Sequence, residues 1–371
     1  MKKILIGVDA SRSNIKQKTG TEYYSFEIIK SITELDKEDD LRLYCKTPLD
    51  YLKPQKNVEI RELHMARLWT QLRLSYELYK NSPDVLFVPS HVIPYIHPKT
   101  VVTLHDVGFR YYPELYTPLE RIYHHLSMRY CVSHATKIIA ISEATKKDLV
   151  KFYGADPKMI TVVYHGYDKN KFYEAKTDKK PEEIEKLGKY IYFIGRLEAK
   201  KNIKNLIAAY GKLRANSKIK HKLVLAGRPG YQFEEILSEI ETLPEEIKKD
   251  IIQPGYIPDE IMADYMRYAS VFVFPSKFEG FGMPLVEAMA CGVPVVASNT
   301  TSIPEIVGNA GILFDPENSD QIAQSIEKVI LDESTRNDLI KKGFSRLELF
   351  DWKRSAEQTL EVIRSTAQLD E

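Results

Sequence analysis

The chain has 371 residues, of which 43% are hydrophobic and 28% are charged, and its formal net charge is +1. This length exceeds one ordinary hydrophobic core and predicts two domains, while the composition is typical of a soluble globular protein. The near-neutral charge argues against a polyanion partner such as nucleic acid. The three cysteines, Cys45, Cys131 and Cys291, form neither a disulfide framework nor a metal-ligand spacing, which is typical of a reducing cytoplasm.

The first residues, MKKILIGVDAS, place two lysines and five apolar or small residues before Asp9. This apolar run is too short for the core of a signal peptide, so we interpret residues 3–8 as a first strand. No stretch approaches the roughly 20 apolar residues that cross a bilayer. We therefore expect that the protein is not an integral membrane protein.

The first half alternates apolar runs with helical patterns, which predicts an α/β domain. The expected strands are residues 3–8, 41–46, 58–62, 85–88, 101–104, 137–141 and 161–164. Gly20 and Thr21 open a helix that runs to about Ile32, and a helix N-terminus attracts phosphate. His105 follows a buried strand, where its ring could hydrogen-bond a sugar hydroxyl or a phosphate, although an isolated histidine is more often structural.

Residues 68–79 read as an amphipathic helix in which Trp69, Leu72, Leu74 and Tyr76 are interleaved with basic side chains. A basic, aromatic helix is able to contact a membrane or a lipid-linked acceptor. The alternative is a helix that packs its apolar stripe on the sheet, and periodicity cannot separate the two. We favour core packing.

Residues 169–189 are charged and lack apolar runs, which predicts a linker before a second α/β domain. The second half opens with a strand at 190–194, then Arg196 and Lys201, then a helix from Ile203. Two cations near a helix N-terminus can bind a diphosphate through charge, hydrogen bonds and the helix dipole. The alternative is a solvated basic surface loop.

Residues 271–297 read as a buried strand at 271–274, a glycine-bearing loop, a short helix and a second buried strand at 293–297. Residues 303–307 and 311–314 are expected to complete the sheet. Glu279 lies in the loop and Glu287 lies in the helix, so the two carboxylates could grip a polyol at two points. The alternative is a plain βαβ unit without a binding function. It would explain Glu287, because a carboxylate interacts favourably with the helix dipole, but it would not explain Glu279 or the paired glycines. We therefore favour a binding function for this stretch.

The run Glu-Gly-Phe-Gly-x-Pro-x-x-Glu-Ala-x-Ala-x-Gly-x-Pro-Val closely resembles the donor-binding signature of retaining GT-B glycosyltransferases of family GT4. The resemblance covers nearly the whole chain and implies two Rossmann-like, doubly wound domains facing a central cleft. We expect the first domain at 1–168, a linker at 169–189 and a nucleotide-sugar-binding domain at 190–350. The resemblance also implies a C-terminal helix at 351–371 that crosses back to the first domain and begins near Trp352.

The resemblance also assigns roles to single residues. It places Arg196 and Lys201 on the leaving diphosphate, Glu287 on the ribose, and Glu279 and His105 on the transferred sugar. Further donor contacts are implied at Gly20, Thr21, Gly227, Tyr256, Gly280, Phe281 and Gly282. Where the family usually has Asn-Gly, this chain has His165-Gly166, a departure from the pattern.

The implied reaction is a metal-independent, retaining transfer of a hexosyl group, with mannosyl favoured, from a GDP- or UDP-linked donor to a glycan or a lipid-linked acceptor. No two aspartates stand at i and i+2, which argues against an Asp-x-Asp metal site, and we expect no cofactor. Peripheral contact with the inner face of the membrane is compatible with such an acceptor.

Three alternatives remain open. One is a sugar-nucleotide epimerase, hydrolase or phosphorylase that shares the architecture. Another is a non-catalytic module that binds nucleotide sugars. A nicotinamide dehydrogenase is disfavoured because the run from Gly280 to Leu285 lacks the third glycine of G-x-G-x-x-G.

Overall fold

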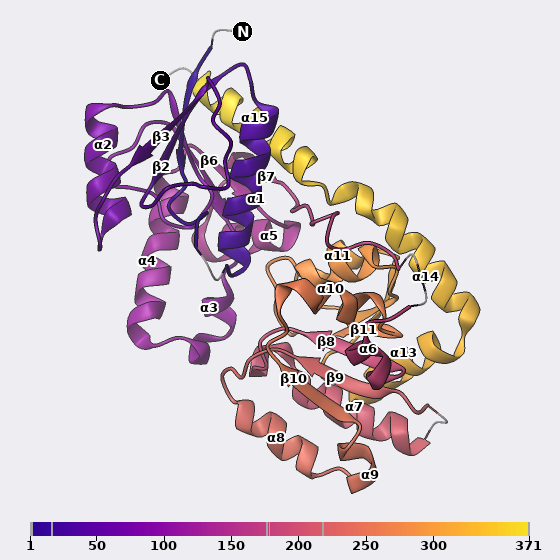
Figure 1. The fold of residues 1–371 in the computed structure, drawn as a ribbon. Coiled ribbons are helices and arrows are strands. Elements are labelled where there is room, and N and C mark those ends of the chain that lie inside the picture. The colour runs from indigo at the N-terminus through magenta and orange to yellow at the C-terminus, as the bar shows by residue number, and fades with distance from the viewer. Residues whose placement is uncertain (1–2, 16–17, 176, 178, 217–218, 370–371) are drawn as a thin grey trace. The chain divides into compact units, whose positions relative to one another are not determined.

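The computed structural model describes residues 3–15, 18–175, 177, 179–216 and 219–369 (Figure 1). It consists of two compact units, one formed by 1–166 with 350–371 and the other by 167–349. Each unit contains one sheet with helices packed against it.

The first unit is built on a seven-stranded sheet in the order β3-β2-β1-β4-β5-β6-β7, with every neighbouring pair parallel. Its strands are β1 (Leu5–Asp9), β2 (Asp40–Cys45), β3 (Val58–Glu62), β4 (Val85–Val88), β5 (Thr100–Leu104), β6 (Lys137–Ala140) and β7 (Ile160–Val162). Its helical segments are α1 (Gly20–Leu35), η1 (Trp69–Leu74), α2 (Ser75–Lys80), α3 (Gly108–Tyr111), η2 (Pro113–Leu115), α4 (Pro118–His134), α5 (Glu143–Tyr153), η3 (Pro157–Met159) and α15 (Trp352–Ala367). All residues of β4 and β5 are buried, as expected for parallel strands covered on both faces.

The helices of the first unit are divided between the two faces of this sheet. Buried residues of η1, α2 and α4 belong to one hydrophobic cluster with alternate residues of β4, β5 and β6. Helix α15 packs against α1, and Figure 1 shows the two side by side in yellow and indigo. The C-terminal helix thus belongs to the first unit and begins at Trp352, as the sequence predicts.

The second unit has a six-stranded sheet in the order β10-β9-β8-β11-β12-β13, again with parallel pairs throughout. Its strands are β8 (Tyr190–Ile194), β9 (Lys222–Ala226), β10 (Ile251–Gly255), β11 (Val271–Phe274), β12 (Val295–Ser298) and β13 (Gly311–Phe314). Its helical segments are α6 (Glu182–Leu187), η4 (Ala199–Lys201), α7 (Ile203–Asn216), α8 (Phe233–Glu241), α9 (Glu245–Lys248), α10 (Asp259–Arg267), α11 (Met283–Ala290), α12 (Ile303–Val307), α13 (Ser319–Leu331), α14 (Glu333–Arg346) and η5 (Leu347–Leu349).

The order of the second sheet fixes where a ligand is expected. The chain winds from β8 outward to β9 and β10, then returns to β11 on the other side of β8. Ligands of doubly wound sheets bind outside the carboxyl ends of the strands at such a switch point. The segments that follow β8 and β11 therefore define the candidate site of this unit.

Two expectations about the second half differ from the structure. Residues 303–307 were expected to complete the sheet but form the helix α12, because Pro304 favours a first helical turn and Ile303, Ile306 and Val307 share one buried face. The stretch 169–189, expected as a linker, lies in the second unit and contains α6. Phe172 and Ile184 are buried there and hold it on the unit, while residues 176 and 178 lie outside the described residues.

Candidate functional site

The loops after β8 and β11 are joined directly at the switch point of the second unit. The backbone N–H of Lys277, after β11, donates to the carbonyl of Lys200, after β8, at 2.8 Å. The residues that the sequence singles out most strongly therefore lie on two loops that contact each other. Sequence spacing alone could not show this contact, because it joins segments far apart in the chain.

Lys201 and Glu279 form an ion pair at this junction. The distance from Lys201 Nζ to Glu279 Oε1 is 2.6 Å, and the two side chains are only 15% and 14% exposed. The ammonium group also lies 5.6 Å from the centre of the Phe274 ring. Lys201 and Glu279, both predicted to contact the donor, thus hold each other in place. A phosphate would meet the cation, and a sugar hydroxyl would meet the carboxylate beside it.

The loop that carries Glu279 is fixed from the segment after β12. The Glu279 N–H donates to Thr301 Oγ1 at 3.1 Å, and Ser302 Oγ donates to the carbonyls of Glu279 and Phe281 at 2.9 and 3.0 Å. Gly282 has a φ of 102° and directly precedes α11. Phe281 is buried, so any contact it makes with a ligand would come from its backbone. Gly280 lies in the same loop.

Glu287 lies in α11, within the same βαβ unit. Burial raises the pKa of its carboxyl to about 7, the nearby Lys171 opposes this shift, and Asp259 and Asp168 add to it. Among the described residues, none donates a hydrogen bond to this carboxylate, which leaves it able to accept hydrogen bonds from ligand hydroxyls. The sequence interpretation missed Asp168, Lys171 and Asp259, which lie on other elements.

Replacing Glu287 by glutamine is expected to stabilise the fold at pH 8 by about 1–3 kcal/mol while weakening donor binding. The folded carboxyl, with a pKa of about 7, binds a proton more tightly than an ordinary carboxyl with a pKa of 4.5. The stability gained from that proton is complete below pH 4.5 and is lost as the pH rises through 7. Urea unfolding at several pH values measures the difference between the two proteins.

The exposed Glu246 supplies the matched control, since Glu246→Gln is expected to change stability little at any pH. A stability difference between Glu287→Gln and the wild type that does not vary between pH 4.5 and 8 would contradict the argument from burial.

Three more candidate residues lie beyond the carboxyl ends of strands in the second sheet: Arg196 after β8, Gly227 after β9 and Tyr256 after β10. Arg196 is exposed, and its side chain passes beside Gly230. A Cβ on Gly227, whose φ is 145°, would lie 1.8 Å from the Gly195 carbonyl oxygen. This close backbone approach by itself requires glycine, so a contact of Gly227 with a ligand stays a prediction.

Tyr256 is 57% exposed, and the guanidinium of Arg228 lies 4.6 Å from the centre of its ring. This cation–π pair presents a flat, positively charged surface beside the loops that carry Arg196 and Lys201. Arg228 is not among the candidate residues that the sequence predicts.

Gly20 and Thr21 form the first turn of α1, in the first unit. The carboxylate of Glu22 already accepts hydrogen bonds from the Thr19 N–H and hydroxyl in this turn, and Arg12 Nη1 lies 3.5 Å from its other oxygen. A phosphate at this helix terminus would therefore meet one carboxylate and one guanidinium. The assignment of Gly20 and Thr21 to the donor stays a prediction.

His105 follows β5 in the first unit and is 8% exposed. Its Nε2 lies 3.2 Å from the Pro89 carbonyl, and burial lowers its pKa, so the ring is neutral at pH 7. If Nε2–H donates to Pro89, Nδ1 is an acceptor that suits a hydroxyl group. The role of His105 on a sugar stays a prediction.

His165, the departure from the family pattern, stacks on the rings of Tyr24 and Trp352 with centres 4.7 and 5.7 Å away, and these two rings also contact each other at 6.0 Å. It joins α1 to the first residue of α15 and thereby helps to hold the C-terminal helix.

The two parallel α/β sheets, and the cation–carboxylate pair with a partly buried glutamate at the switch point of the second, agree with the GT-B glycosyltransferase class expected from the sequence. The chain belongs to the glycosyltransferases of family 4: the model for "Glycosyl transferases group 1" matches residues 174–346, and that for "Glycosyltransferase Family 4" matches residues 36–171.

A similar relative is the O-antigen chain mannosyltransferase B of Escherichia coli, 29% identical over 93% of this chain and 96% of that protein. The alpha-maltose-1-phosphate synthase of Mycolicibacterium smegmatis is 28% identical over 64% of this chain and 65% of that protein.

Among solved structures, the sucrose-phosphate synthase of Thermosynechococcus elongatus has a TM-score of 0.74 at 18% identity, over 98% of this chain and 99% of that one. Anabaena HepE in complex with UDP has a TM-score of 0.71 at 20% identity, over 98% of this chain and 100% of that one. These matches confirm the predicted fold class.

Within the described part of the chain, no helix is long and apolar enough to span a membrane, and no group of three or more His, Cys, Asp or Glu residues could hold a metal ion.

Proposed function

We propose that this glycosyltransferase moves a mannosyl group from GDP-mannose, or a related hexosyl group from a UDP-linked donor, to a glycan or a lipid-linked acceptor. The observation that carries the proposal is the Lys201–Glu279 pair at the switch point of the second sheet, with Glu287 in the same βαβ unit. The match to a mannosyltransferase over nearly all of both chains supports mannose as the sugar.

In this proposal the transfer retains the anomeric configuration and needs neither metal nor cofactor. The bond from the anomeric carbon to the diphosphate oxygen breaks, and the acceptor oxygen forms its new bond on the same face of the sugar. The acceptor hydroxyl proton passes to the departing phosphate oxygen. Arg196 and Lys201 stabilise the charge that grows on this phosphate more in the transition state than in the ground state, which lowers the barrier.

The remaining residues would bind and orient the donor. Glu287 accepts hydrogen bonds from the ribose hydroxyls, while Glu279 and the backbone amides of Gly280, Phe281 and Gly282 hold the sugar. Tyr256, supported by Arg228, lies beside the base, and Gly227 allows the backbone to pass close by. Contacts of His105, Gly20 and Thr21 with the same donor belong to the proposal on the strength of the family resemblance. A cytoplasmic enzyme with peripheral membrane contact would suit a lipid-linked acceptor.

The first experiment is a thermal-shift screen against GDP, UDP, ADP and NAD in EDTA and in magnesium. A ligand that binds the folded state alone raises the melting temperature, so we expect GDP or UDP to do so without metal. Stabilisation by NAD alone would overturn the proposal.

Product analysis then separates the remaining alternatives. An epimerase or hydrolase would convert the donor at full rate without an acceptor, and a binding module would release no nucleotide. We expect nucleotide release that depends on a glycan or lipid-linked acceptor and a product with the anomeric configuration of the donor. An inverted product would contradict the proposed mechanism.

A further inference from the structure

Segment η1–α2 turns large apolar side chains toward solvent. Leu68, Leu72, Tyr76 and Tyr79 are 62%, 50%, 52% and 74% exposed. Leu72, Tyr76 and Tyr79 recur at spacings of four and three residues, which places them on one side of this segment, and Leu68 directly precedes η1. Core packing, which the sequence interpretation favoured for this segment, therefore describes only its other side.

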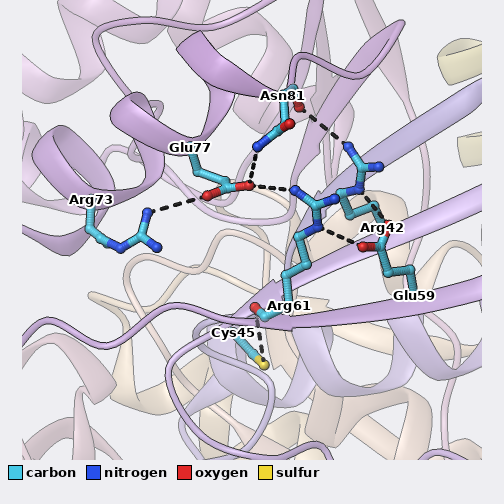
Figure 2. A network of polar contacts seen from close by, with 7 residues as sticks. All are labelled: Arg42, Cys45, Glu59, Arg61, Arg73, Glu77 and Asn81. Carbon is cyan, nitrogen blue, oxygen red and sulfur yellow. Dashed lines mark hydrogen bonds and ion pairs between the residues drawn. The ribbon is translucent and has the colours of Figure 1, made fainter.

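A polar network fixes this orientation (Figure 2). Glu77 on α2 accepts from Arg61 of β3 at 2.5 Å, from Asn81 at 3.0 Å and from Arg73 at 3.4 Å. Arg42 of β2 reaches the Asn81 carbonyl at 3.3 Å. Because these bonds attach the polar side of the helix to the edge of the sheet, Leu72, Tyr76 and Tyr79 face outward, whereas Leu74 and Leu78 pack inward.

Helix α4 repeats the arrangement. Leu119, Ile122, Tyr123 and Leu126 are 80%, 57%, 48% and 57% exposed, and their spacing of i, i+3, i+4 and i+7 defines one helical stripe. The opposite side of α4 contributes Met128, Cys131 and Val132 to the hydrophobic cluster that also contains the buried side of η1 and α2. Both helices thus cover the same face of the first sheet, and both lie at the left of the first unit in Figure 1.

The segment between the two helices connects their outer surfaces. Ser75 Oγ of α2 accepts from the backbone N–H groups of Tyr95 and Ile96 at 3.0 and 3.3 Å, and these two side chains are 63% and 50% exposed. The rings of Tyr95 and Tyr130, on α4, meet edge to face with centres 5.6 Å apart. We call the combined surface the apolar band; it comprises Leu68, Leu72, Tyr76, Tyr79, Tyr95, Ile96, Leu119, Ile122, Tyr123, Leu126 and Tyr130.

The charges around the apolar band are mainly positive. Residues 65–80 and 118–130 contain five arginines and lysines but only two carboxylates, Glu77 and Glu120. Glu77 is held in the network above, and Glu120 accepts from the N–H and hydroxyl of Thr117 at the start of α4. Arg67, Arg121 and Arg129 are exposed, and none of them forms an ion pair with any described residue.

We propose that the apolar band is a docking surface for an anionic lipid bilayer. Exposed apolar surfaces of this extent mark interaction sites. Amphipathic helices with leucine and aromatic side chains on one side and basic side chains beside them lie in the headgroup region of membranes, where tyrosine is enriched. The arginines would meet anionic headgroups at the membrane surface. The surface deepens the proposed function, because it would bring the enzyme to a lipid-linked acceptor.

The test is flotation of the full chain with vesicles of phosphatidylcholine alone or with a third of phosphatidylglycerol, and without a sugar donor. We expect binding to the anionic vesicles that weakens at high salt. Leu72→Ser with Tyr79→Ser, and separately Leu119→Ser with Leu126→Ser, should each lower the partition coefficient by roughly tenfold or more. Arg67→Glu with Arg129→Glu should remove the preference for anionic vesicles.

Matched controls lie outside the band. Leu331→Ser changes a leucine of the second unit that is as exposed as Leu68, and Lys186→Glu with Lys353→Glu reverses two exposed charges. Both should leave binding unchanged. Failure to float with anionic vesicles, or equal losses in the controls, would overturn the proposal. Light scattering that shows a dimer dispersed by the band variants would instead assign the surface to a second copy of the chain. Because no donor is present, the result is independent of the proposed reaction.

Discussion

Replacing Arg196 by alanine is expected to lower kcat by about a hundred- to a thousand-fold, with a smaller rise in the KM for the donor. Arg196 lies just beyond the carboxyl end of β8. In the proposed mechanism, negative charge grows there on the leaving phosphate. A group that stabilises the transition state more than the bound substrate changes kcat, whereas a group that binds both equally changes KM. Steady-state kinetics with the donor identified by the thermal-shift screen measure both constants.

Two further variants sharpen this test. Arg196→Lys keeps the charge but loses the bidentate geometry, so it should recover only part of the lost rate. Lys204→Ala removes an exposed cation in the next helix and should leave kcat unchanged. Since Arg196 is exposed, the melting temperature of Arg196→Ala should stay close to that of the wild type. An unchanged kcat would show that Arg196 does not act on the leaving group.

Replacing Arg364 by alanine is expected to lower the free energy of unfolding by about 3–5 kcal/mol. Arg364 on α15 donates to Asp39 Oδ2 at 2.8 Å and to Asp36 Oδ1 at 3.1 Å, and the side chains of these aspartates are 8% and 0% exposed. Without the guanidinium, two neighbouring buried carboxylates face each other without a cation. Urea unfolding followed by circular dichroism measures the loss.

Lys353 provides the control on the same helix. Its ion pair with Glu357 spans 3.9 Å and is largely exposed, so Lys353→Ala should cost no more than about 0.5 kcal/mol. Adding Asp36→Asn and Asp39→Asn to Arg364→Ala should restore part of the stability, because no buried charge would then lack a partner. The free-energy losses of Asp36→Asn and Asp39→Asn are also measured one at a time. If the triple variant were less stable than Arg364→Ala by the sum of these two losses, uncompensated charge would not be the cause.

Local patterns in the sequence were sufficient to predict most strands and the main binding stretch. Apolar runs predicted β8 and β11 to the residue, since a strand buried on both faces requires a continuous run. The edge strand β13 was also predicted to the residue, although it is mostly only half-buried. The stretch 271–297 carried its strand, loop and helix signals within a few residues of one another. Such signals depend on neighbours along the chain, so they can be recognised without knowledge of the tertiary structure.

Other elements were missed although a signal was present. Helix α4 begins with Thr117, Pro118 and Glu120, a capping box with proline in the first turn, which the sequence interpretation did not use. The helix α12 was mistaken for part of the sheet because a five-residue apolar segment fits either structure until the buried spacing is known.

The sequence by itself determined the alternation of strands and helices, the family resemblance and the residue types at the candidate site. Only the tertiary structure decided that Lys201 and Glu279 pair across 78 positions, and that Glu287 lies where burial raises its pKa. It also decided that the apolar side of η1 and α2 with Leu72 and Tyr79 faces solvent. Charge interactions and burial depend on distances through space, and periodicity shows that a helix has an apolar stripe without showing what covers it.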